Sequence, residues 1–231
     1  MKMRMLLAAS AAVGMLGAAS AANALITVET PPVADDLLGT TLGAHGMVML
    51  EDFDNPTAPN VLFTGNEVTT TPDPIDDSAP PPWSGGVLVG GSTVPVDPTD
   101  YASVQAGGTS TFSIAPGFYL TSFSFYLGSP DDFNKVTFNS ANGGTQSFLG
   151  EAIWGGSPPG TGDRSLGYRV YYDFGGAKVT SITFESSQDA FEFDGLAGNV
   201  VAVPEPGTWA LMILGFGGAG AMLRRRKMAL A

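Results

Sequence analysis

The sequence predicts an all-β protein, an antiparallel β-sandwich of a jelly-roll-like kind. Apolar and polar residues alternate with a period of two along many short segments, which is typical of strands with one buried face. No segment between residues 25 and 203 keeps the 3.6-residue apolar period of an amphipathic helix. The 231 residues include 31 glycines and 17 prolines, which supply turns, and 14 phenylalanines, which supply a core.

The strands are expected where the alternation is clearest. Four of them are predicted around residues 123–127, 168–174, 182–184 and 191–193. Further short strands are predicted at residues 47–53, 61–64, 87–89, 109–115 and 135–139. Because Gly, Pro, Asn or Asp bounds each of these segments, about ten short strands are expected to form two packed sheets with solvated outer faces.

Two segments interrupt the strand pattern and are predicted to be long loops. Residues 69–82 contain five prolines, and residues 155–163 contain four glycines and two prolines. Residues 25–43 are expected to be a loose lead-in strand. The chain is therefore divided into a segment at 1–24, one β domain at 25–202 and a C-terminal segment at 203–231.

The first 24 residues have the composition of a secretory signal peptide. Lys2 and Arg4 precede the apolar stretch 6–19, and Ala22-Asn23-Ala24 matches the small-residue pattern at which such peptides are cleaved. The apolar stretch is too short to be a good membrane span. We therefore expect export through the Sec translocon and removal of this segment by signal peptidase.

The C-terminal segment combines three features in a fixed order. A proline-bracketed acid comes first, then an apolar stretch, then four basic residues. The residues are Pro204, Glu205, Pro206, Trp209 and Ala210 in the first part, 209–223 in the apolar stretch, and Arg224, Arg225, Arg226 and Lys227 in the basic part. As a helix the apolar stretch would measure about 22 Å, somewhat less than a hydrocarbon core of about 30 Å. A short transmembrane helix is predicted, with the basic residues acting as the stop on the cytoplasmic side.

This order of features closely resembles the PEP-CTERM sorting signal of Gram-negative bacteria in its PEPxxWA form, here Pro204 to Ala210. The resemblance implies that an exosortase, a membrane protease or transpeptidase, recognises the segment and cuts near the motif. It implies an exported precursor anchored in the inner membrane and then a protein of the cell surface or extracellular matrix. It also implies an association with exopolysaccharide and biofilm. Residues 123–138 and 182–196 resemble segments of the β-sandwich bodies of other PEP-CTERM proteins.

Charge and composition exclude several functions. Residues 25–203 carry 21 acidic and four basic residues, a net charge of −17, so nucleic acid is not an expected partner. The chain has no cysteine and a single histidine, His45, which excludes thiolate and multi-histidine metal sites. His45 lies between two glycines and is expected in a surface turn, and the sequence contains no nucleophile-elbow motif. The body is therefore expected not to be an enzyme.

The sequence leaves two alternatives open for a group of acidic residues. They bind a structural Ca²⁺ ion, or they are solvated on outer faces and turns. Glu51, Asp52 and Asp54 follow an early strand, and Asp194 lies in the last one. The first and last strands of a sandwich commonly lie side by side, which would bring these carboxylates together around an ion that takes six to eight oxygens. The arrangement resembles in outline the Ca²⁺ site of jelly-roll carbohydrate-binding modules.

Three aromatic residues are candidates for sugar binding. Trp83 and Trp154 lie at the edges of the two predicted loops, and Tyr126 is at an outward position of a predicted strand. Exposed rings of this kind can stack on sugars, while the alternative is that they belong to the core.

The leading hypothesis from the sequence is a non-catalytic, exosortase-sorted envelope or matrix protein. A sugar-binding module, and less favoured a polysaccharide hydrolase, are the two other classes that it leaves open.

Overall fold

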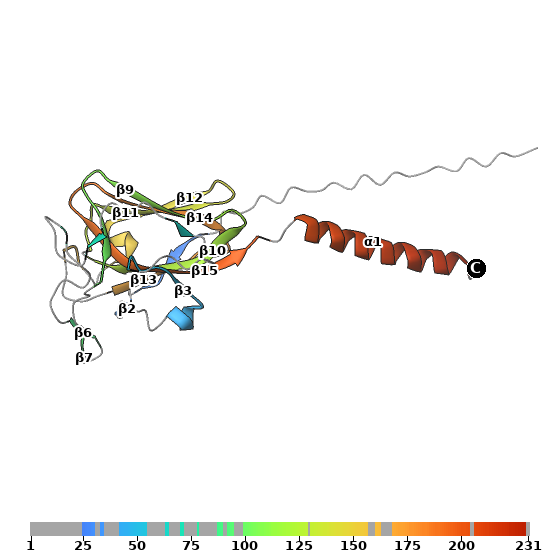
Figure 1. The fold of residues 1–231 in the computed structure, drawn as a ribbon, viewed down its shortest axis with the longest axis horizontal. Helices are drawn as coiled ribbons and strands as arrows, with labels where there is room; N and C mark the ends of the chain where they lie inside the picture. Colours follow the sequence, from blue (N-terminus) through green and yellow to red (C-terminus); the bar gives the residue numbers. More distant parts are fainter. Residues whose placement is uncertain are drawn as a thin grey trace, which may run out of the picture.

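The computed structural model confirms the all-β sandwich. It describes residues 25–30, 33–34, 42–54, 63–64, 70–71, 78, 87–89, 92–94, 99–128, 130–156, 160–162, 168–203 and 206–229. Two antiparallel layers face each other, and a single long helix leaves one end of them (Figure 1). The predicted signal peptide, and with it Lys2, Arg4 and the cleavage pattern, lies outside the described residues.

The first layer has the strand order β12-β11-β14-β9-β4. Its strands are β12 (Thr145–Leu149), β11 (Asn134–Ser140), β14 (Val179–Ser186), β9 (Thr109–Ile114) and β4 (Phe63–Thr64). On its outer face hydroxyl and amide side chains are bonded across the strands, for example Thr111 to Thr183 at 3.0 Å and Thr137 to Ser147 at 2.9 Å. Lys135 and Glu185 form an ion pair of 2.7 Å on the same layer. This face has the solvated character that the alternation predicts.

The second layer is built around β10 (Phe118–Leu127), which lies between β13 (Tyr168–Asp173) and β15 (Phe191–Ala202). Short strands complete it on both sides. They are β1 (Thr27–Val28) and β2 (Val33–Ala34) on β13, β3 (Val48–Glu51) and β8 (Tyr101–Val104) on β15, and β5 (Thr70–Thr71) on β8. A separate hairpin joins β6 (Val87–Val89) to β7 (Ser92–Val94). The two layers meet at one corner, where Leu120 of β10 pairs with Val179 of β14.

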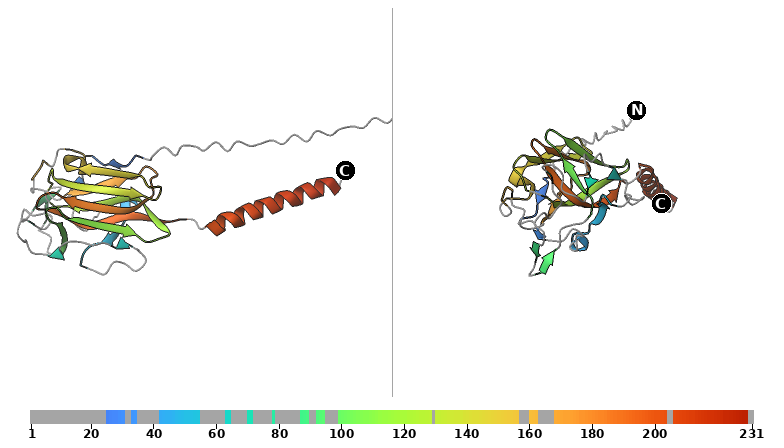
Figure 2. Two further views of the ribbon diagram at one scale, coloured as in Figure 1. Left: turned by 90° about the horizontal axis from the view of Figure 1, so that it is seen from above. Right: turned by 60° about the vertical axis from the view of Figure 1, so that its left-hand side comes forward.

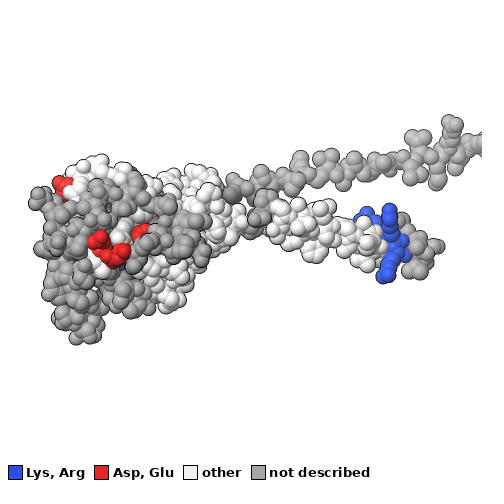
Figure 3. Space-filling model, viewed as in Figure 1, with Lys and Arg blue, Asp and Glu red and all other residues white. Residues whose placement is uncertain are grey.

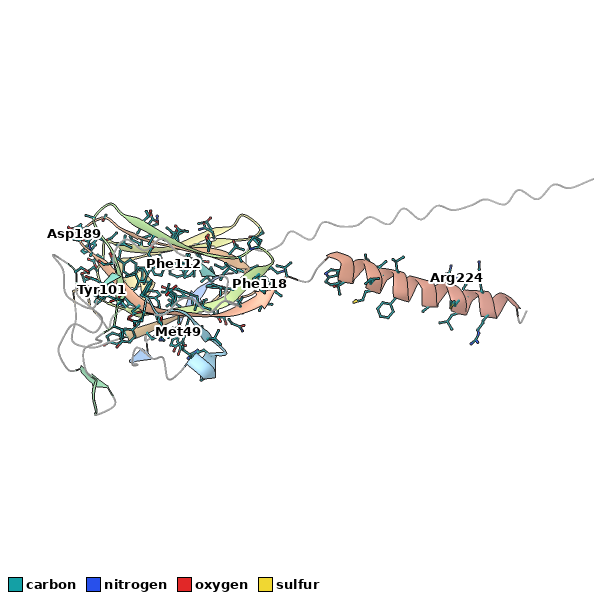
Figure 4. All side chains as sticks on the ribbon, viewed as in Figure 1. Met49, Tyr101, Phe112, Phe118, Asp189 and Arg224 are labelled. Atoms are coloured by element: carbon teal, nitrogen blue, oxygen red, sulfur yellow. The ribbon has the colours of Figure 1, made fainter. Side chains whose placement is uncertain are left out.

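Phenylalanine side chains from both layers form the core. Phe184 of β14 stacks on Phe193 of β15 with ring centroids 3.9 Å apart, and it contacts Phe125 of β10 edge-on at 5.3 Å. Phe112 of β9 lies between the layers and meets Phe193 at 6.0 Å (Figure 4). All four rings are buried. Edge-to-face and offset pairs add about 0.5–1.5 kcal/mol each to the free energy of burial, so this cluster fixes how the sheets face each other.

Several strands differ from the prediction. β12 and β8 were not expected, because Thr145–Leu149 and Tyr101–Val104 contain few large apolar residues. The predicted loop 69–82 contains the strand β5, whereas β1 and β2 lie in the segment predicted as a lead-in strand. β12 forms a hairpin with β11, whereas β1, β2, β5 and β8 obtain their hydrogen bonds from strands distant in sequence, which local patterns do not reveal.

Two 3₁₀ turns and one glycine shape the ends of the strands. The turns are η1 (Leu42–His45), before β3, and η2 (Gly150–Ile153), after β12. Gly128 follows β10 at a point of close approach, since a Cβ there would lie 2.6 Å from the Cβ of Glu192. Its amide donates to the Glu192 carbonyl oxygen at 2.9 Å, so any larger residue would separate β10 from β15 at this end.

The C-terminal helix α1 (Pro206–Ala229) is longer than predicted. The predicted helix covers residues 209–223. Proline is accepted in the first turn because its missing N–H would have no partner there, and arginine, lysine and methionine are good helix formers. Pro206 therefore begins the helix, and the basic residues are part of it.

Removing the central ring should destabilise the whole sandwich. We expect Phe184→Ala to lower the free energy of unfolding by about 3–5 kcal/mol, because the cavity cannot close between two hydrogen-bonded sheets. Denaturant unfolding of the two proteins measures the difference. Leu149→Ala, at a residue that is 60% exposed, is the control and should change stability by less than about 0.5 kcal/mol. Equal effects of the two substitutions would contradict this assignment of the core.

Stability should also fall in alkaline solution through Tyr172. Its hydroxyl is buried and donates to the Ile153 carbonyl at 2.5 Å. Burial raises the pKa of Tyr172 well above its ordinary value of about 10. The unfolded chain therefore releases this proton first as the pH rises. The contribution of Tyr172 is fully present below pH 10 and is lost progressively above it.

Comparison with Tyr172→Phe isolates this effect. The variant loses one hydrogen bond at neutral pH, but its free energy of unfolding should decline less steeply above pH 10. Denaturant titrations at a series of alkaline pH values test this. Identical slopes for the two proteins would be incompatible with a titrating Tyr172.

Candidate functional site

The predicted sorting segment begins where the last strand of the sandwich ends. Ala202 of β15 is in register with Phe118 of β10, and the Val203 amide donates to the Gly117 carbonyl at 2.7 Å. Pro204 and Glu205 lie outside the described residues, and α1 starts at Pro206. The backbone is thus held by the sheet up to the residue that precedes the motif.

The side chains of α1 are exposed on every side of the helix. Its exposed large apolar residues are Trp209, Leu211, Met212, Ile213, Leu214, Phe216, Met222 and Leu223, at 50–74% of their full accessibility. Arg224, Arg225 and Arg226 are also exposed and gather near the C-terminal end of α1 (Figure 3). Cations there are favoured by the negative end of the helix dipole. Lys227 lies in the same helix.

The predicted transmembrane character of this segment is not confirmed. Among the described residues, no helix combines enough length with enough apolarity to cross a membrane.

The outer face of the second layer differs from that of the first, because it is buried and polar. Tyr126 of β10 is directly opposite Arg169 of β13 and Asp194 of β15, so these three side chains share one face. That face is opposite to the core side, to which Phe125 and Phe193 point. Ser103 of β8 lies opposite Glu192 of β15, and all of these polar residues are fully buried. We call Ser103, Ser124, Tyr126, Arg169, Glu192 and Asp194 the buried polar layer.

Arg169 is central to the buried polar layer. Its Nη1 donates to the Gly195 carbonyl at 2.7 Å and to the Ser124 hydroxyl at 3.2 Å. Its guanidinium lies 6.0 Å from the centre of the Tyr126 ring, a cation–π distance. These contacts connect β13, β10 and β15 from the side that faces away from the phenylalanine core.

Part of the cover of this face is described. Leu42 of η1 and Met47 are buried against Tyr171 and Ala197, and Met49 packs beside them. Ser78 is buried and donates to Ser103 at 2.7 Å. The prediction that this outer face is solvated is therefore wrong.

The sugar-binding prediction is wrong for two of its three residues. Trp154 is fully buried in the main core, next to η2, and Tyr126 is fully buried in the polar layer. A ring enclosed on both faces cannot stack on a sugar, so the core alternative holds for Trp154. Trp83 lies outside the described residues.

The calcium prediction is right about strand adjacency and wrong about the cluster. β3 does pair with β15, with Glu51 in register with Leu196. Among the described residues, however, no group of three or more acidic or histidine side chains is placed to hold a metal ion. The acids accept local backbone bonds instead, as Glu51 does from Phe53 at 2.9 Å and Asp194 from Gly195 at 2.5 Å. Asp54 accepts from Asp100 at 3.1 Å, and Asp52 shares no such cluster.

His45 lies at the end of η1 beside a small cavity of about 220 Å³. Its ring stacks on Tyr171 with centroids 3.9 Å apart, and its Nδ1 is 3.7 Å from Glu29 Oε2. Asp173 and Ser122 complete the polar lining. The expected position of His45 in a turn is confirmed. Its imidazole also connects η1 to the second layer through the contacts with Tyr171 and Glu29.

Sequence reasoning missed the buried polar layer, although its residues were visible. Arg169, Glu192 and Asp194 occupy the polar positions of strands whose apolar positions were identified correctly. Arg169 directly after Tyr168, and Glu192 between Phe191 and Phe193, were the available indications, since a charged residue beside aromatic residues in a strand suits a covered face better than a solvated one.

Comparisons with known proteins bear mainly on the C-terminal segment. Residues 202–227 match the family model of the PEP-CTERM protein-sorting motif. The search of curated proteins gave no match. Among solved structures, the family 11 carbohydrate-binding module of the cellulosomal cellulase Lic26A-Cel5E of Clostridium thermocellum is similar, at 12% identity. That alignment covers 69% of this chain and 96% of the module, with a TM-score of 0.21.

The buried polar layer leads to a prediction about stability. Arg169→Met keeps much of the side-chain volume but removes the donors to Gly195 and Ser124 and the only described cation of the layer. We expect a loss of about 3–5 kcal/mol in the free energy of unfolding, as for other buried charges deprived of a partner group. Lys178→Met, at an exposed position, is the control and should have little effect. A neutral result for Arg169→Met would show that the layer does not hold the strands together.

Proposed function

The chain carries a PEP-CTERM protein-sorting motif at residues 202–227, and from this premise we propose that it is an exported protein, anchored to the inner membrane through α1 and then processed by an exosortase. The β-sandwich is the cargo, which reaches the cell surface or the extracellular matrix. Pro204, Glu205, Pro206, Trp209 and Ala210 are substrate residues of the processing enzyme and not catalytic groups.

The observation that carries this proposal is the apolar surface of α1. A helix that buries one face against a protein is apolar along one stripe, whereas α1 exposes large apolar residues all around. Exposed apolar residues around the whole helix favour contact with lipid on every side over lying flat on a membrane with one face. Trp209, in the second turn, suits the boundary between hydrocarbon and headgroups, and the arginines suit the far boundary.

The place of the motif supports processing at this point. The sandwich holds the chain through the bond from Val203 to Gly117, and α1 begins three residues later. A cut near Pro204 to Pro206 would separate a fully hydrogen-bonded domain from its anchor without removing any strand. The folded domain would then leave the membrane unchanged.

We propose a non-catalytic role for the sandwich itself. The polar residues that it buries act between strands, as Arg169 does, and most of its described aromatic residues are buried. Association with exopolysaccharide and biofilm stays a prediction from the family resemblance. The sugar-binding alternative now depends on Trp83.

Replacement of the motif tests the sorting proposal. With Pro204, Glu205 and Pro206 all changed to alanine, the protein should keep its tail and remain in the membrane fraction of the native host. The unchanged protein should lose the tail, as intact-mass analysis would show. Thr208→Ala, at a variable position of PEPxxWA, is the matched control and should be processed normally. Loss of the tail from the triple variant would refute recognition of this motif.

A further inference from the structure

A mostly apolar groove lies at the end of the sandwich from which the C-terminal segment leaves. Its volume is about 420 Å³, and it is lined by the turn before β10, the start of β10, and residues of two neighbouring turns and Val203. The residues on which the argument depends are Pro116, Phe118, Tyr119, Ala141, Lys178 and Val203. We call this region the stem groove. Figure 4 shows Phe118 at the end of the sandwich next to α1, whereas Tyr101 and Asp189 lie at the opposite end.

The start of the described chain lies at the same end. The carbonyl oxygen of Leu25 lies against Gly175, since a Cβ built there would be 2.6 Å from it. Gly175 belongs to the turn that also contains Lys178 and Ala177, whose amide bonds to Phe174. Leu25 is 68% exposed. Hence both ends of the described domain reach the surface beside the stem groove.

The connection between the stem groove and α1 is short. Three Cα steps separate Val203 from Pro206, and a fully extended chain covers at most about 3.6 Å per residue. The first residue of α1 is therefore within about 11 Å of Val203. The headgroup region on each side of a bilayer is about 5–8 Å thick. If α1 is inserted in lipid, this end of the sandwich is held against the headgroups.

The chemistry of the stem groove suits that position. Lys178 is exposed, and its Nζ lies 5.1 Å from the centre of the Tyr119 ring. Val203 is 44% exposed, and none of the described residues that line the groove is acidic. This contrasts with the net charge of −17 between residues 25 and 203. The acidic side chains visible in Figure 3 lie on the part of the sandwich away from α1.

We propose that the stem groove is a lipid-contact surface. In the anchored precursor it lies on the headgroup layer of the membrane, with Lys178 directed to lipid phosphate and with Phe118 and Tyr119 at the interface. Tyrosine and lysine are the side chains that favour this boundary, because each has an apolar body and a polar tip. The orientation of the sandwich is then fixed before processing, with the acidic side chains that are visible in Figure 3 turned away from the membrane. Figure 2 shows how α1 continues from this end of the two layers.

This inference rests on the proposed anchoring through α1, and one experiment separates the two. Because the chain has no cysteine, a single introduced cysteine carries a fluorescent label at one known place. Three variants of the full chain are needed: Ala141→Cys in the stem groove, Ser187→Cys at the opposite end, and Gly217→Cys in α1. All three positions are exposed. Each protein is reconstituted in phosphatidylethanolamine–phosphatidylglycerol vesicles that contain spin-labelled lipid as a quencher.

The expected result has three parts. A quencher in the acyl chains should quench the label at position 217, and a quencher on the headgroups should quench the label at 141 several-fold more strongly than the label at 187. Quenching at 217 with equally weak quenching at 141 and 187 would overturn the lipid-contact surface and leave the anchoring intact. Absence of quenching at 217 would overturn both.

Charge reversal gives a second measurement. In the Ala141→Cys background, Lys178→Glu should reduce headgroup quenching at 141 and leave acyl-chain quenching in the Gly217→Cys background unchanged. Lys135→Glu, on the outer face of the first layer, is the matched reversal and should change neither. The same label can be measured in membranes that contain an exosortase. If the fluorescence of the label at position 141 changes only in those membranes, and headgroup quenching is absent without the enzyme, the groove binds the enzyme and the lipid proposal is wrong.

Discussion

The pairing of β10 with β15 is the constraint on which the rest of the structure depends. The two strands are the centre of the second layer, and between them they contact β13, β3, β8 and, at one corner, β14. Phe125 and Phe193 project from this pair into the core, while Tyr126 and Asp194 project to the opposite face. The last pair of the ladder, Phe118 with Ala202, decides where the chain leaves the sandwich. Core, polar layer and stem groove are thus all positioned by one ladder.

The two outer faces of the sandwich have different physical roles. The first layer exposes hydroxyls, amides and the pair of Lys135 with Glu185, which favours solubility for a domain destined for export. The second layer buries Arg169 and two acids beneath covering segments. Buried charges are expensive to desolvate, so a covered polar face is retained only when its groups are well bonded. The bonds from Arg169 to Gly195 and Ser124 offset part of this cost.

The candidate site divides into a part that local sequence encodes and a part that it does not. Pro204 to Ala210 and Arg224 to Lys227 belong to a linear motif, so their order in the sequence was sufficient to identify it. The residues of the stem groove come from segments up to about 90 positions apart, such as Ile114 and Val203. They meet only because β10 and β15 pair and because two turns close over the same end.

Sequence alone determined the fold class, the phenylalanine positions of the core and the sorting segment, because a period of two and a linear motif are both local properties. Only the tertiary structure decided which polar faces are wet, where Trp154 and Tyr126 lie, and whether the acids of β3 and β15 gather. The alternation of apolar and polar residues predicts that a side chain points away from the core, but it does not predict whether another segment covers that side chain. Whether a side chain on the outer face is buried, as those of Arg169, Glu192 and Asp194 are, depends on contacts between segments distant in the sequence. No local pattern contains that information.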